Sequence, residues 1–118
     1  PALTEETGKL FSALTGGKYD RMLLDRQMDV MAGETAEPAL RPGGYLSAGT
    51  QDALYLALRL AVCRLALPAG TPVVLDDALV CFDDTRLRRA LDALQFEAQT
   101  RQILLLTCQS REENILHP

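Results

Sequence analysis

Leu46-Ser47-Ala48-Gly49-Thr50-Gln51-Asp52 stands between a glycine-rich loop and a long apolar run at residues 53–67. When small residues precede a helix, the first backbone N–H groups of that helix are unpaired, and the helix dipole adds partial positive charge there. Such a turn can bind an anion: Ser47 and Thr50 would add hydroxyl donors, and Gly49 would let a phosphate approach the backbone. The same turn can serve only as a helix cap, and taken alone it does not separate the two interpretations.

The apolar run at residues 53–67 predicts a buried helix rather than a membrane span. Arg59 and Arg64 interrupt the run, and it is shorter than the ~20 apolar residues that cross a bilayer. We therefore expect no membrane partner.

The composition predicts one globular domain over residues 1–118. Hydrophobic residues make up 47% of the chain and charged residues 24%, as in ordinary globular proteins. The net charge of −4 argues against nucleic-acid binding by this chain unaided, because phosphate binding needs clustered Lys and Arg.

The three cysteines, Cys63, Cys81 and Cys108, are odd in number and have no C-x-x-C spacing. This pattern predicts buried or free thiols in a reducing compartment rather than disulfides or a zinc site. The chain begins at Pro1 without a basic segment followed by an apolar one, so we expect no signal peptide and a cytoplasmic location.

Two short apolar runs further along the chain predict strands of an α/β fold. Val73-Val74-Leu75 ends in the carboxylates Asp76 and Asp77, and a second run covers Ile103–Leu106. Continuous apolar runs are typical of strands buried on both faces of a largely parallel sheet. An amphipathic helix, capped by Asp84 or Thr85, is expected between them, and this order indicates an α/β domain with helices flanking the sheet.

The first third of the chain predicts a helix followed by a small N-terminal β-hairpin. The helix covers residues 4–14 and is stopped by Gly16-Gly17. The hairpin strands are expected at residues 19–24 and 28–31, joined through residues 25–27. Residues 33–44 are expected to be loop with a short edge strand.

Gly16-Gly17-Lys18 invites comparison with a phosphate-binding loop, but the pattern is wrong. A Walker A loop reads G-x-x-x-x-G-K-[ST] between a strand and a helix, whereas Tyr19 follows the lysine here. The segment is interpreted as a helix stop leading into a strand.

Asp76 and Asp77 lie where open α/β sheets bind ligands, at the carboxyl end of a strand. Successive strand residues point to opposite faces, so the two carboxylates would have different roles. One can hold Mg²⁺ through its water shell, and the other can orient or deprotonate an attacking water. An acidic pair can also simply end a strand and begin a turn.

The order of these motifs resembles the C-terminal lobe of an ABC-type ATPase head, of the branch that includes the SMC proteins, RecN and SbcC-type ATPases. The likeness covers roughly residues 15–111. Residues 46–52 match the signature motif, residues 73–77 the Walker B strand and residues 78–83 the D-loop. The wording DDALVCFDD at residues 76–84 looks closest to the bacterial YhaN-like members. In this family residues 1–14 would be the end of a coiled-coil arm, although one or two heptads do not by themselves establish an arm.

The resemblance implies a role for each matched residue. Asp76 would hold Mg²⁺, Asp77 would be catalytic, and Asp83 would lie in the D-loop at a dimer interface, where it can also cap a helix. The signature residues, which would contact a nucleotide bound to another subunit, are Leu46, Ser47, Ala48, Gly49, Thr50 and Gln51.

Two positions depart from the family pattern. The second acid of the pair is more often Glu, so the shorter Asp77 must reach further. The family's switch histidine is absent: its segment reads Thr107-Cys108-Gln109, and the single histidine, His117, lies near the end. Gln109, or Cys108, would have to contact the γ-phosphate, without the positive charge of an imidazolium.

The resemblance implies the C-terminal half of an ATP-hydrolysing head in DNA repair or chromosome maintenance, with ATP and Mg²⁺ as cofactors and nucleoid association. Because no segment here fits Walker A, the partners would be a Walker A-bearing N-terminal lobe of the same protein and a second head in an ATP-bound head-to-head homodimer. The chain alone would be inactive. DNA would bind through the full-length protein, and a nuclease is a further implied partner.

Two alternatives remain open on the residues. A degenerate lobe could bind nucleotide or a partner without hydrolysis, as Gln109 and Asp77 suggest. An unrelated small α/β domain could instead use its acidic cluster to bind a metal.

Overall fold

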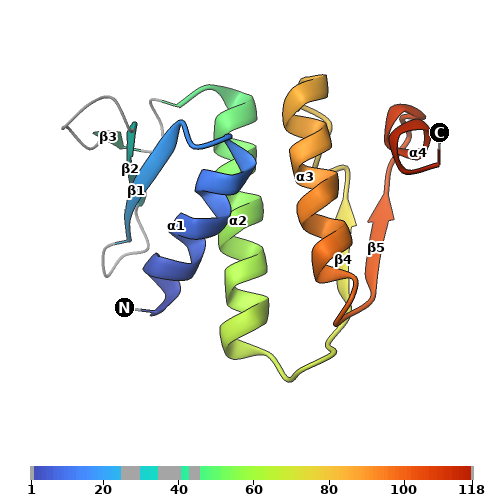
Figure 1. The fold of residues 1–118 in the computed structure, drawn as a ribbon, viewed down its shortest axis with the longest axis horizontal. Coiled ribbons are helices and arrows are strands. Elements are labelled where there is room, and N and C mark those ends of the chain that lie inside the picture. Colours follow the sequence, from blue (N-terminus) through green and yellow to red (C-terminus); the bar gives the residue numbers. More distant parts are fainter. Residues whose placement is uncertain (1, 25–29, 35–40, 43–45, 118) are drawn as a thin grey trace.

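The computed structural model of the chain describes residues 2–24, 30–34, 41–42 and 46–117. These residues form a flattened body of 40 × 32 × 20 Å (Figure 1). The elements in chain order are α1 (Ala2–Leu14), β1 (Tyr19–Leu24), β2 (Val30–Glu34), β3 (Arg41–Pro42), α2 (Ala48–Ala66), β4 (Val73–Asp76), α3 (Asp84–Glu97), β5 (Ile103–Leu106) and α4 (Arg111–Leu116).

Helix α2 runs through the middle of the body, with α1 and the β1–β3 sheet on one side and α3 with β4 and β5 on the other (Figure 1). Leu54 and Leu60 of α2 are fully buried, as are Phe11 and Leu14 of α1, and these side chains belong to one core. The predicted buried helix is therefore confirmed, and none of the described helices is long and apolar enough to cross a membrane.

The described residues form two small sheets. Strands β1, β2 and β3 form an antiparallel sheet, and β4 pairs with β5 in parallel, with Val73 opposite Ile103 and Asp76 opposite Leu106. The α/β class and the N-terminal hairpin are confirmed. A mostly parallel sheet is not seen in the described parts of the chain, where the parallel sheet has only these two strands.

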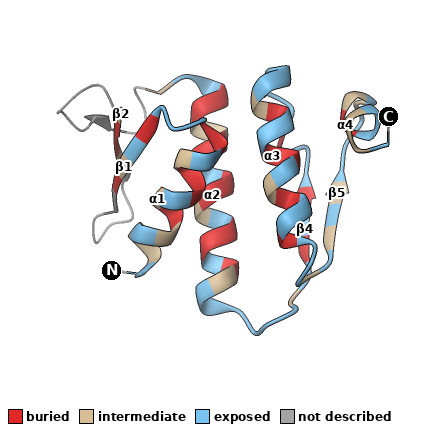
Figure 2. Cartoon of the chain, in the orientation of Figure 1, coloured by how far each residue is buried: buried red, intermediate tan, exposed pale blue. Residues whose placement is uncertain are grey.

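The β4–β5 pair is covered on one face only (Figure 2). Val73 and Leu75 are buried, whereas Val74 is 44% exposed. On β5, Leu104 and Leu106 are 43% and 52% exposed. The prediction that these strands are buried on both faces is wrong for this structure, because no described element packs over the second face.

Three predicted boundaries shift. The first helix begins at Ala2 rather than at residue 4. The second hairpin strand is Val30–Glu34, and residues 28 and 29 of the predicted strand lie outside the described residues. Helix α3 is capped by Asp83 rather than by Asp84 or Thr85, because the Asp83 carboxylate accepts the Arg86 N–H at 2.7 Å, and this confirms that Asp83 can cap a helix.

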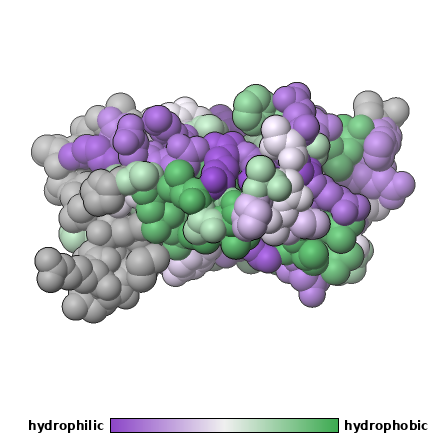
Figure 3. Space-filling view, turned by 90° about the horizontal axis from the view of Figure 1, so that it is seen from below, coloured by the Kyte–Doolittle hydropathy of each residue, from purple (hydrophilic) through white to green (hydrophobic). Residues whose placement is uncertain are grey.

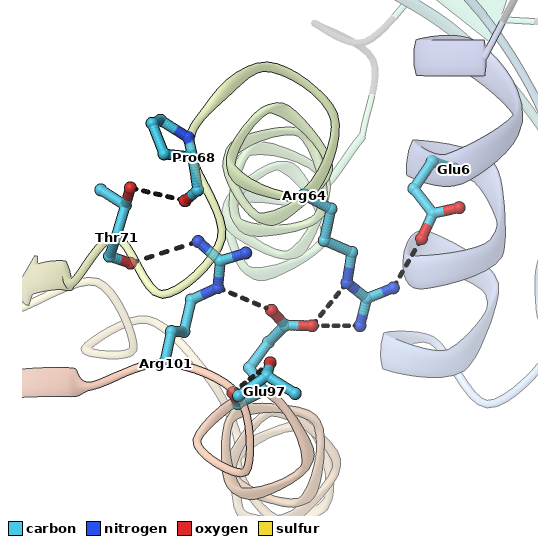
Figure 4. Close-up of polar contacts among 7 residues, drawn as sticks. Glu6, Arg64, Pro68, Thr71, Glu97 and Arg101 are labelled. Atoms are coloured by element: carbon cyan, nitrogen blue, oxygen red, sulfur yellow. Dashed lines mark hydrogen bonds and ion pairs between the residues drawn. The ribbon is translucent and has the colours of Figure 1, made fainter.

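A buried ion network holds the three long helices together (Figure 4). Glu97 of α3, only 3% exposed, accepts from Arg64 Nε of α2 at 2.5 Å. Arg64 also donates to Glu6 of α1 at 2.6 Å, and Arg101 pairs with Glu97 at 3.3 Å while donating to the Thr71 carbonyl at 3.2 Å. Burial lowers the pKa of Arg64, but its bonds to Glu97 and Glu6 outweigh this and raise that pKa above its ordinary value.

Candidate functional site

The predicted site residues lie at one end of the molecule. Strands β4 and β5 are parallel, so their carboxyl ends meet at the same edge, and the N termini of α2 and α3 reach the same end of the body (Figure 1). This is the edge at which open α/β sheets bind ligands.

Ser47 is the N-cap of α2. Its Oγ accepts the Thr50 N–H at 3.2 Å and donates to Thr50 Oγ1 at 2.8 Å. The Gln51 side chain closes the turn by donating to the Leu46 carbonyl at 3.0 Å. Ser47 and Ala48 are exposed, but Thr50 is only 2% exposed, so the prediction that its hydroxyl is an open donor is wrong. The open groups of this turn are the N–H groups of the first helical residues.

Gly49 is buried against protein rather than open to a ligand. A Cβ at this position would lie 2.7 Å from Arg86 Nη1 and 3.1 Å from the Cys81 carbonyl oxygen. The predicted reason for a glycine here, close approach of a phosphate, therefore needs correction. The absence of a side chain lets the start of α2 pack against residues 81 and 86.

A second contact joins α2 to the same segment. The Cys81 thiol donates to the Asp52 carboxylate, and this hydrogen bond together with the negative charge of Asp52 raises the pKa of Cys81. Residues 46–52 and residues 78–83 are therefore in direct contact, although about thirty positions separate them along the chain.

Asp77 has the backbone conformation of a left-handed helix, with φ at 52°. It is the single non-glycine residue with positive φ in the described ranges, and such conformations cluster at functional turns. Its N–H donates to the Leu106 carbonyl at 2.8 Å, which extends the β4–β5 ladder by one bond. The chain turns sharply here, so Asp77 does not continue the strand alternation and leaves the sheet with its side chain exposed.

The carboxylate of Asp76 is exposed at the last position of β4. Across the described part of the chain, no group of three or more His, Cys, Asp or Glu side chains gathers as a metal site. The exposed carboxylates of Asp76 and Asp77 fit Mg²⁺, which commonly takes one or two protein carboxylates and completes its shell with water and substrate phosphates.

Gln109 lies across a shallow hollow from the residues that follow β4. The hollow is lined by residues 80–83 and 108–111. Gln109 Oε1 accepts from Arg111 Nε at 2.8 Å, and the Gln109 N–H donates to Thr107 Oγ1 at 3.1 Å. Cys81 and Cys108 are free and exposed, and Cys63 is free and buried, as the cysteine pattern predicts.

No protein-family model matches the chain. The uncharacterized protein YhaN of Bacillus subtilis (strain 168) is 34% identical over 120 residues. That match covers 99% of this chain but 12% of YhaN, so the chain spans about an eighth of its relative's length.

Solved SMC head structures superpose on almost the whole chain. A structure from work on ATP-driven dimerization and DNA-stimulated activation of SMC ATPases gives a TM-score of 0.79 at 17% identity, over 97% of this chain and 71% of that one. The chain has the fold of an SMC ATPase head domain. The Smc head of Pyrococcus yayanosii, with a coiled coil and joint, gives 0.76 at 16% identity, over 97% of this chain and 23% of that one. The Smc head of Pyrococcus furiosus bound to the C-terminal domain of ScpA gives 0.74 at 16% identity, over 97% and 30%.

The resemblance stated from the sequence, to the C-terminal lobe of an SMC-type ATPase head and to YhaN, is confirmed. Within this SMC head fold, two arginines at the candidate site escaped the sequence reasoning. Arg86 lies over Gly49, and Arg111 bonds to Gln109 and to the segment after β4. Both residues look like ordinary surface cations in the sequence, and no local signal marks them.

Proposed function

We propose that this chain is the C-terminal half of an ATP-hydrolysing head and that its site is completed by other parts of the assembly. The observation that supports the proposal is that the turn at Ser47, the acidic pair at Asp76 and Asp77, and Gln109 all lie at the same end of an SMC head fold, where the parallel strands β4 and β5 end. In this proposal residues 46–51 are the signature motif, residues 73–77 the Walker B strand and residues 78–83 the D-loop.

Asp76 and Asp77 have different roles in this proposal. Asp76 holds Mg²⁺ through its water shell, and the cation, when bound, neutralises charge on the β- and γ-phosphates. Asp77 orients the attacking water and accepts its proton. Its left-handed backbone turns the chain at the end of β4, and its side chain is exposed there.

The first partner is a Walker A-bearing N-terminal lobe of the same protein. Parallel sheets are nearly always covered on both faces, yet one face of the β4–β5 pair exposes Val74, Leu104 and Leu106. The surface at the end where α2 leads into β4 also carries separate apolar patches (Figure 3), and Leu65 and Leu67 are exposed there. An N-terminal lobe would cover the open face of the sheet and supply the phosphate-binding lysine.

The second partner is another head. Ser47 and Ala48 are exposed at the start of α2, where they can face a nucleotide held by a second subunit. ATP then joins two heads into a homodimer, and ATP-driven dimerization is described for SMC ATPases that share this fold. DNA repair or chromosome maintenance in the cytoplasm is the proposed setting. We expect DNA to bind other parts of the full-length protein, because this chain carries a net charge of −4 and DNA phosphates need clustered Lys and Arg.

A second candidate function is nucleotide or partner binding without hydrolysis. Gln109 stands where the family has a histidine, and its amide oxygen is already held by Arg111. A neutral amide cannot supply the charge that an imidazolium gives to a developing phosphate.

Reassembly of the head tests the proposal. This chain and the Walker A-bearing lobe of the parent protein are purified separately and mixed, and ATP turnover is measured for each part and for the mixture. We expect turnover from the mixture only. A stable mixture that binds ATP without hydrolysing it would favour the second candidate, and a mixture that binds no ATP would contradict both.

A further inference from the structure

Arg111 connects the two segments that flank the hollow of the candidate site. It is the first residue of α4, and its guanidinium reaches the loop between β4 and α3. Nη1 donates to the Phe82 carbonyl at 2.7 Å, and Nη2 donates to the carbonyls of Leu79 at 3.1 Å and Val80 at 3.3 Å. One side chain therefore binds three backbone carbonyls of residues 78–83.

The loop between β4 and α3 has little hydrogen bonding of its own. Inside it, the Val80 N–H donates to the Asp77 carbonyl at 3.4 Å and the Phe82 N–H to the Leu79 carbonyl at 3.2 Å, both long for such bonds. The three bonds from Arg111 are charge-assisted and each is shorter than or similar to these. Arg111 therefore supplies a large part of what holds the backbone of this loop.

The remaining edge of the guanidinium sets the orientation of Gln109. Nε donates to Gln109 Oε1 at 2.8 Å, and an arginine, which has only donors, must bond to the oxygen end of an amide. The –NH₂ end of Gln109 is thereby left as the donor end, with two hydrogens. A donor is what a residue beside a γ-phosphate must present.

We propose that Arg111 is a positioning residue that couples the loop at residues 78–83 to Gln109 and keeps the Gln109 amide donating into the nucleotide site. This inference rests on the proposed ATPase function. In this proposal Arg111 does not contact the nucleotide, because its guanidinium already binds Gln109 and the backbone carbonyls of the loop. Arg111 Nη1 also lies 3.5 Å from Asp84 Oδ1.

The test uses the reassembled head with Arg111→Ala, Arg111→Lys and, as a matched control on the exposed surface of α3, Arg88→Ala. Without ATP, backbone amide hydrogen exchange of residues 78–83 is followed by mass spectrometry, because the hydrogen bonds of the Val80 and Phe82 N–H groups lie inside this loop and report its opening. With ATP, kcat and KM are measured for each variant.

We expect Arg111→Ala to raise the exchange rate of residues 78–83 about tenfold, the low end for losing several charge-assisted hydrogen bonds, and to lower kcat by about tenfold with KM unchanged. Arg111→Lys should restore neither the wild-type behaviour of the loop nor the wild-type kcat in full, because an ammonium group cannot make the several directed hydrogen bonds of a planar guanidinium. Arg88→Ala should match wild type in both assays.

Hydrogen exchange of residues 78–83 equal to wild type in Arg111→Ala would overturn the proposal, as would faster exchange with unchanged kcat. Full rescue by Lys would also overturn it, since charge alone would then suffice. A wild-type head without turnover would contradict the proposed function instead. The exchange rates would still test whether Arg111 holds the loop: faster exchange in Arg111→Ala would support this part of the proposal, and an unchanged rate would overturn it.

Discussion

The guanidinium of Arg86 fills the space that a side chain at position 49 would need: a Cβ on Gly49 would lie 2.7 Å from Arg86 Nη1. The Cys81 carbonyl closes the other side at 3.1 Å. The start of α2 is thus packed against both the loop after β4 and the first turn of α3.

Gly49→Ala should lower the free energy of unfolding. The Arg86 guanidinium can swing aside, but the Cys81 carbonyl oxygen at 3.1 Å belongs to the backbone. Overpacking against it costs about 1–3 kcal/mol, which exceeds the gain of about 1 kcal/mol that Ala brings to a helix. Gly8→Ala in α1 is the control: nothing lies within 4 Å of a Cβ there, so it should stabilise the chain by about 0.5–1 kcal/mol. Urea denaturation measures both. A Gly49→Ala chain as stable as Gly8→Ala would show that the space is open.

Glu97→Gln should destabilise the chain by about 2–4 kcal/mol, because it removes the charge that two arginines share in a buried place. Arg64 keeps Glu6, but Arg101 keeps only the Thr71 carbonyl. Exposed Glu113→Gln on α4 is the control and should change stability by less than about 0.5 kcal/mol. Equal effects of the two substitutions, measured by denaturation, would contradict the account of the network.

The contact between Cys81 and Asp52 predicts a pH dependence. The pKa of Cys81 is raised in the folded chain, so the thiol proton favours folding below the ordinary thiol pKa, and this contribution is lost as pH rises through the raised pKa. Asp52→Asn removes the carboxylate and should lower the pKa of Cys81. The pH profile of Cys81 alkylation measures this shift. A profile that stays in place in Asp52→Asn would show that the two side chains do not interact.

Ser47→Asp distinguishes the two roles proposed for Ser47, as the cap of α2 and as part of an anion site. Asp caps helices as well as Ser does, so stability should change by less than about 0.5 kcal/mol. Its negative charge would repel a γ-phosphate, and ATP-driven dimerisation of the reassembled head should be lost. Ser47→Ala, which loses the cap at a cost of about 1 kcal/mol but adds no charge, should keep more of the dimer. Light scattering with ATP compares them, and full dimerisation of Ser47→Asp would leave the turn as a helix cap only.

Local chemistry explains which features were predictable. A small hydroxyl residue before an apolar run marks Ser47 as the start of α2, and continuous apolar runs mark β4 and β5. The sequence leaves the cap of α3 open among Asp83, Asp84 and Thr85, because all three residue types favour that position, and the structure selects Asp83. Burial on both faces was assumed from the apolar runs alone, and the pattern of a strand does not say which elements are present to cover it.

The two arginines could not be found from local patterns. Arg111 bonds to a carbonyl 29 positions earlier, and Arg86 packs against a glycine on another helix. Such contacts depend on the tertiary arrangement rather than on spacing along the chain. The role of Gly49 was misjudged for the same reason, since the neighbour that requires a glycine is distant in sequence.

ATP turnover by the reassembled head carrying Asp77→Asn tests the central claim most directly. This substitution keeps size and shape but removes the base, so hydrolysis should fall at least ~10²-fold while ATP and Mg²⁺ still bind and the dimer persists. Asp76→Asn, measured beside it, should instead weaken Mg²⁺-dependent ATP binding and reduce the dimer. Unchanged turnover in both variants would show that the pair only ends a strand and would contradict the ATPase account.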